Sequence, residues 1–162
     1  MYSKISAYEI SQIAIGMEED GFQFYQQASK YAGNEKIKAV FLKLANDEIE
    51  HKNEFAGKDF ARYFGEVSDS VMEMDRYIKD MFKTKIFPSV TNAKEHAHHI
   101  KNDEEALLLG VEQERRAIKF YTELKRLAAS KDAGVAIEEM IQEEKKHLKI
   151  LLDIIVELHG KK

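Results

Sequence analysis

Apolar residues recur at spacings of three and four along this chain, which is the period of an α-helix that buries one face. One such stripe consists of Ile37, Phe41, Leu44, Glu48, His51 and Phe55. A second consists of Ile137, Met140, Glu144, His147, Leu151, Ile154 and Leu158. Each stripe is apolar except for one Glu-x-x-His pair. The pattern therefore predicts that two carboxylates and two imidazoles face the core of a helical protein.

Capping and stop residues divide the chain into four predicted helices. Ser6–Glu9 and Asn102–Glu105 each have the form of a capping box that opens a helix. The predicted caps and ends are Ser6 to Gly33, Asn34 to about Phe64 with Gly65 after it, Asn102 to the region of Ala128, and Asp132 to Leu158 or His159.

The segment from 66 to about 101 is predicted to be a long crossover between the second and third helices. Pro88 interrupts it, and it is long enough to span a bundle of helices of about 25 residues, roughly 38 Å. The expected fold is an all-α four-helix bundle of two helical hairpins, and residues 1–162 are expected to form one domain.

The two hairpins repeat each other in spacing. A shift of 96 positions superposes Glu18 on Glu114, Tyr25 on Tyr121, Glu48 on Glu144 and His51 on His147. The separation from the first to the second Glu is 30 residues in each half. Two hairpins facing each other across a pseudo-twofold axis would bring the four Glu and two His side chains to one level of the core.

Bare carboxylates in a core are unfavourable by several kcal/mol unless something compensates their charge. Four carboxylates would neutralise two divalent cations, and two imidazoles would provide one nitrogen ligand for each ion. This oxygen-rich set suits iron or manganese better than zinc or copper. The repeated pattern therefore predicts a dinuclear metal site.

The whole chain resembles the rubrerythrin type of ferritin-like protein, as a stand-alone ferritin-like domain. The motifs that carry the resemblance are Glu18-x6-Tyr25, Glu48-x-x-His51, Glu114-x6-Tyr121 and Glu144-x-x-His147. The resemblance implies two iron ions per chain, with manganese as the alternative. It implies that Glu18 and Glu114 are terminal ligands, that Glu48 and Glu144 bridge the ions, and that His51 and His147 bind one ion each. Tyr25 and Tyr121 are then expected to hydrogen-bond ligand carboxylates.

The resemblance also implies an oxidoreductase that reduces hydrogen peroxide or dioxygen, as in defence against oxidative stress. Two features depart from full rubrerythrins: a Cys-x-x-Cys module is absent from the sequence, and Ala117 stands where a further carboxylate is expected. Electrons would therefore arrive from an external donor protein. The alternatives are a ferroxidase or iron-handling protein, a di-manganese catalase-like protein, and a non-enzymatic helical adaptor with a structural metal site. A homodimer is expected by analogy.

The composition of the chain argues against several classes of binding partner and of chemistry. The net charge of -4, without a basic patch, argues against nucleic acid, and no apolar run approaches membrane-spanning length. The polar start of the chain favours a cytoplasmic protein. The absence of cysteine excludes disulfides, thiol catalysis and cysteine-ligated iron in this sequence.

Two further groups of residues have open roles. Asp47 and Glu143 each precede a stripe histidine by four residues, and they are interpreted either as orienting an imidazole or as solvated charges. His96, His98 and His99 are interpreted as an exposed polar turn, with an accessory iron site as the alternative.

Overall fold

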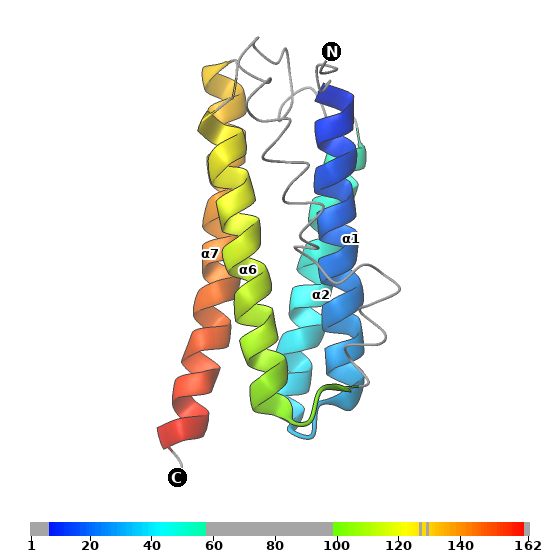
Figure 1. Cartoon of the computed structure of the whole chain (residues 1–162), viewed down its shortest axis with the longest axis vertical. Coiled ribbons are helices and arrows are strands. Elements are labelled where there is room, and N and C mark those ends of the chain that lie inside the picture. Colours follow the sequence, from blue (N-terminus) through cyan, green and yellow to red (C-terminus); the bar gives the residue numbers. More distant parts are fainter. Residues whose placement is uncertain (1–6, 58–98, 127, 129, 161–162) are drawn as a thin grey trace.

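The computed structural model describes residues 7–57, 99–126, 128 and 130–160 (Figure 1). Four helices make up this part of the chain, so the predicted all-α bundle is confirmed. Their bounds are Ala7–Tyr31 for α1, Glu35–Ala56 for α2, Asp103–Arg126 for α6 and Lys131–Gly160 for α7. The predicted crossover from 66 to about 101 lies outside the described residues as far as residue 98, and so do His96, His98 and the Ser6 cap. His99 is exposed.

Two helix starts agree with the predicted caps. Asn34 caps α2, because its side chain accepts hydrogen bonds from the backbone N–H groups of Lys36 and Ile37. Asn102 caps α6 by accepting from the N–H of Glu105 at 2.9 Å. The Glu105 carboxylate reaches back to the N–H of Lys101 at 2.7 Å, one residue before the position that a capping box predicts.

Two predicted boundaries were wrong. α2 ends at Ala56 rather than near Phe64, since Gly57 leaves the helical conformation and its N–H turns back to Glu54 O at 3.3 Å. α7 is capped by Ser130 rather than Asp132, because Ser130 Oγ accepts from the N–H of Ala133 at 3.1 Å. Asp132 lies in the first turn, where its charge complements the helix dipole.

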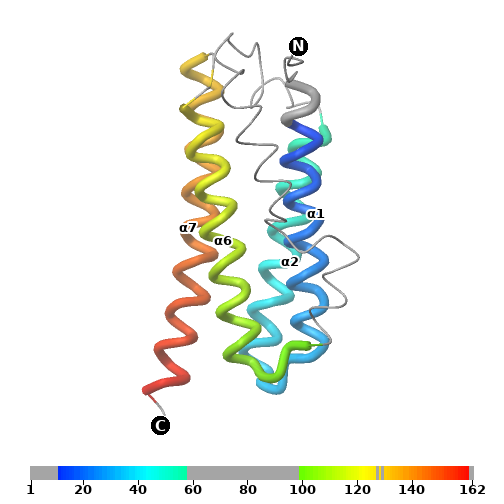
Figure 2. The backbone as a smooth tube through the Cα atoms, in the orientation of Figure 1, coloured from blue at the N-terminus to red at the C-terminus, as the bar shows by residue number. Residues whose placement is uncertain are grey.

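The bundle consists of two antiparallel hairpins packed face to face. α1 packs chiefly on α2, and α6 packs chiefly on α7. Figure 2 shows that α1 and α7 run in one direction and α2 and α6 in the other. Asp103 joins the hairpins at one end, since its carboxylate accepts from the N–H groups of Gly33 at 2.9 Å and Asn34 at 3.0 Å. None of the helices among the described residues is long and apolar enough to cross a membrane.

Two apolar clusters fill the interior, one toward each end of the bundle. The first includes Met17, Phe55, Ala117, Tyr121 and Met140. The second includes Phe24, Tyr25, Leu44, Val111 and Leu151. On every helix, the predicted Glu and His ligands fall in sequence between a member of one cluster and a member of the other. The fold therefore sandwiches a polar layer between two apolar cores.

Candidate metal centre

The six side chains predicted as ligands are buried in this polar layer. They are Glu18, Glu48, His51, Glu114, Glu144 and His147. They form two groups, and the ligand atoms within each group lie within 4.8 Å of one another. One group is Glu18, Glu48, His51 and Glu144, and the other is Glu48, Glu114, Glu144 and His147. Glu48 and Glu144 belong to both groups, as the bridging positions predicted from the sequence would.

The first group converges on the Nδ1 atom of His51. This atom lies 3.4 Å from Glu18 Oε2 and 3.5 Å from Glu144 Oε1. All three atoms are buried, and none has a hydrogen-bond partner within the described residues. Two carboxylate oxygens and an imidazole nitrogen that point at one another without a hydrogen bond are unfavourable in a core, unless a cation or a proton lies among them.

The second group has the same arrangement around the Nδ1 atom of His147. This atom lies 3.2 Å from Glu144 Oε2, 3.6 Å from Glu48 Oε1 and 3.8 Å from Glu114 Oε2. The two imidazole rings stack with their centroids 5.8 Å apart. Each half of the sequence repeat therefore turns one imidazole nitrogen toward the shared carboxylates.

The two tyrosines cross from one hairpin to the other. The Tyr25 hydroxyl donates to Glu114 Oε1, and the Tyr121 hydroxyl donates to Glu18 Oε1. Each tyrosine also meets the preceding phenylalanine edge to face at a centroid distance of 5.2 Å. These matched contacts place the pseudo-twofold axis between the hairpins. The tyrosines do contact carboxylates that were predicted to be ligands.

Burial and mutual repulsion govern the protonation of the carboxylates. Burial, followed by the charge of Glu144, raises the pKa values of Glu48 and Glu114 well above 4.5. Burial also raises the pKa of Glu144, but its hydrogen bond with His147 and the nearby imidazole of His51 outweigh burial and lower this pKa to about 2. Burial lowers the pKa of His51, yet the close carboxylates of Glu144 and Glu18 raise it to about 11. Protons therefore compensate the buried charge when no cation does.

The tyrosines remain protonated donors. Burial first, and then the neighbouring carboxylate charges, raise the pKa values of Tyr25 and Tyr121 well above 10. Each hydroxyl proton is thereby held on the phenol oxygen, where it donates to a carboxylate.

Asp47 orients an imidazole, but on the opposite hairpin. Its Oδ2 lies 3.2 Å from Nε2 of His147, which leaves Nδ1 of that ring directed at the carboxylates. The sequence placed Asp47 four residues before His51 and could not show which histidine it contacts. In α7, the position equivalent to Asp47 is Glu143, which forms an ion pair with Lys146 instead.

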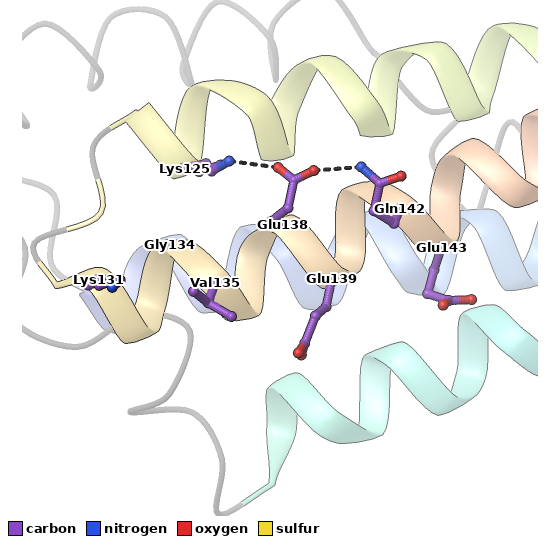
Figure 3. A pocket seen from close by; sticks show the side chains of 8 residues that line it. All are labelled: Lys125, Lys131, Gly134, Val135, Glu138, Glu139, Gln142 and Glu143. Carbon is purple, nitrogen blue, oxygen red and sulfur yellow. Dashed lines mark hydrogen bonds and ion pairs between the residues drawn. The ribbon is translucent and has the colours of Figure 1, made fainter.

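Glu143 borders a surface hollow of about 550 Å³ near the start of α7 (Figure 3). Val135 also lines this hollow, as do Lys125 and Glu138, which form an ion pair of 2.7 Å. The Glu143 side chain is 44% exposed. Glu143 is therefore a solvated surface charge, whereas Asp47 supports the buried site.

Sequence reasoning missed one buried polar residue beside the carboxylates, Gln113. It lines a small cavity against Glu18, Glu48 and Glu114 and is 6% exposed. The internal repeat could have revealed Gln113. A shift of 96 positions places it on Met17, so a polar residue stands where the other half has a member of the apolar stripe of α1.

The donor atoms fit two first-row metal ions. Two atoms that each lie about 2.1 Å from one ion are roughly 3 to 3.5 Å apart. The separations of 3.4 and 3.5 Å around His51 match this spacing, and the shortest one around His147 is 3.2 Å. Four carboxylates with one imidazole nitrogen per group form an oxygen-rich set that favours iron or manganese.

Comparison with known proteins finds one family. Residues 9–107, more than half of the chain, match the family model described as Rubrerythrin. No curated protein and no solved structure matches the chain. The matched range contains Glu18, Glu48 and His51, and the internal repeat extends the same pattern to Glu114, Glu144 and His147.

Proposed function

Because the chain belongs to the rubrerythrin family, we propose that it is a dinuclear iron oxidoreductase that reduces hydrogen peroxide, or dioxygen, with electrons from an external donor protein. One observation carries the proposal. Two groups of buried ligand atoms share Glu48 and Glu144, and the unsatisfied donor atoms in the first group converge.

Each residue has a defined task in this proposal. Glu18 and His51 would hold one ion, and Glu114 and His147 would hold the other. Glu48 and Glu144, which belong to both groups, would be shared by the two ions. Manganese remains the alternative metal.

Two ferrous ions at this site would supply two electrons, one from each ion, and with two protons these reduce one hydrogen peroxide to two waters. The same two electrons and two protons would take dioxygen only as far as hydrogen peroxide. Peroxide is thus the oxidant that a single turnover reduces completely, which favours it as the substrate.

The protein residues control protons and geometry around this reaction. The Tyr25 and Tyr121 hydroxyls hold the carboxylates of Glu114 and Glu18 in place from opposite hairpins. Asp47 fixes the ring of His147. The apolar clusters on both sides exclude bulk water, so a large reductant has to deliver electrons from the surface of the bundle.

Stopped-flow oxidation of the di-ferrous protein tests this proposal. We expect hydrogen peroxide to oxidise the reduced site faster than dioxygen does, with about one peroxide consumed per pair of ferrous ions. If peroxide leaves the reduced site unchanged while dioxygen and excess ferrous iron build a mineral, the protein is an iron-handling ferroxidase instead. The electron donor, a homodimer, a role in oxidative-stress defence and a cytoplasmic location stay predictions.

A further inference from the structure

The residues behind the two imidazoles of the candidate metal centre differ. His147 directs Nδ1 at the ligand carboxylates of its group, and its Nε2 lies 3.2 Å from Asp47 Oδ2. Lys43, one turn earlier on α2, donates to the same oxygen of Asp47 and so holds that carboxylate in place. The ring of His147 is therefore fixed at both nitrogens, with an anchored carboxylate at the nitrogen that does not face the ligand group.

His51 does not have this support from the residues that the structure describes. Its contacts with carboxylates in this part of the chain are made through Nδ1, to Glu18 and Glu144. The residue equivalent to Asp47 on α7 is Glu143, which pairs with Lys146 at 2.5 Å on the surface. The His51 side chain is also 10% exposed, whereas that of His147 is 2% exposed. The internal repeat is thus broken at the position behind each imidazole.

We propose that the two metal sites are inequivalent, and that the first metal ion binds to the group around His147, with Asp47 as the positioning residue that sets this order. The inference rests on the dinuclear site of the proposed function. Each group offers three carboxylates and one imidazole, so the ligand types alone favour neither site. A carboxylate behind a ligating imidazole fixes the ring and strengthens the near nitrogen as a donor, and its loss lowers metal affinity by about 10- to 100-fold. The ion beside His51 is then the more weakly bound and the more readily exchanged.

Calorimetric binding of Mn²⁺ measures the two steps without any redox reaction. The variant Asp47→Asn keeps the shape of the side chain and removes its charge. We expect it to weaken the first binding step by about 10- to 100-fold, while two ions still bind at saturation. Glu143→Gln makes the same kind of change at the equivalent residue of the other half, and as the matched control it should leave both steps unchanged.

Anomalous scattering from crystals grown with one Mn²⁺ per chain shows where the first ion lies. A tenfold preference places roughly nine-tenths of the bound metal in the group around His147, and Asp47→Asn should spread the metal over both groups. Ligand variants give a second readout if Asp47→Asn does not fold. His51→Ala should keep the first binding step and lose the second, whereas His147→Ala should weaken the first step.

The possible results distinguish a failure of this inference from a failure of the proposed function. If the wild type binds fewer than two ions at saturation, the dinuclear site fails, and the inequivalence of its two halves fails with it. If two ions bind but the first lies beside His51, or equally in both groups, the dinuclear site stands and the binding order is overturned. An Asp47→Asn variant with an unchanged first step would overturn the role of Asp47.

Discussion

Replacing Glu144 with alanine is expected to lower the affinity for both metal ions by at least about 100-fold. Mutation of a residue that only hydrogen-bonds a metal ligand already lowers metal affinity by about 10- to 100-fold. Glu144 belongs to both ligand groups, so its loss should have a larger effect. It is 1% exposed, and it is the carboxylate that contacts both imidazoles, at 3.5 Å from His51 and 3.2 Å from His147. Anaerobic titration with ferrous iron measures the effect.

Glu143→Ala is the matched control. This neighbour is a surface charge paired with Lys146, so its removal should leave the iron stoichiometry and affinity unchanged. Glu144→Gln keeps the side-chain volume and replaces the alanine variant if that one does not fold. Two ions bound to Glu144→Ala with an affinity within about tenfold of the wild type would refute the bridging role.

Metal removal is expected to destabilise the protein increasingly as pH rises. In the metal-free chain, Glu48 and Glu114 have pKa values well above their usual 4.5. Between pH 4.5 and the raised value, each is protonated when folded but ionised when unfolded. The stability present below pH 4.5 is therefore lost as pH rises, by up to about 1.4 kcal/mol per pH unit for each group.

Two further groups of the site, His51 and Glu144, set the limits of this pH window. The pKa of His51 is raised from 6.5 to about 11, so its contribution is full below pH 6.5 and is lost above it. The pKa of Glu144 is lowered from 4.5 to about 2, so its contribution is full above pH 4.5 and is lost in stronger acid. The metal-free protein should thus be most stable near pH 4.5 and lose stability faster above pH 6.5.

Thermal unfolding of metal-free and metal-loaded protein at pH 5 and pH 7.5 checks this expectation. Bound cations replace the protons on the carboxylates, so the melting temperature Tm of the loaded protein should vary little over this range. The gap in Tm should widen from pH 5 to pH 7.5 by up to roughly 14 to 28 °C, because the two carboxylates together lose up to about 7 kcal/mol over this range, at roughly 2 to 4 °C per kcal/mol. An equal gap at both pH values would refute the protonation account.

Helical period and the repeat predicted the bundle and its polar layer. Four apolar stripes specify four helices, because a helix must bury its apolar face. Glu48 and His51 were recognised on such a stripe, since charged residues there need a compensating partner. The matched spacing of Glu114, Glu144 and His147 then predicted that both halves meet, and the structure places these side chains together.

The sequence pattern could not predict the contacts between helices, or which of two nearby residues would end or cap a helix. The pairing of Asp47 with His147 depends on how α2 and α7 are rotated against each other, which sequence spacing does not give. The end of α2 at Ala56 and the Ser130 cap of α7 are local choices between two plausible stop or cap residues. Gln113 is polar, so it was not assigned to the apolar stripe of α6.

Metal analysis of anaerobically reconstituted protein tests the dinuclear site most directly. Two ligand groups that share Glu48 and Glu144 predict about two iron or manganese ions per chain. The Asp47→Asn variant should retain both ions, since Asp47 orients His147 without belonging to either ligand group. A stoichiometry of one ion per chain in the wild type would contradict the account, because one of the two ligand groups would then hold no ion.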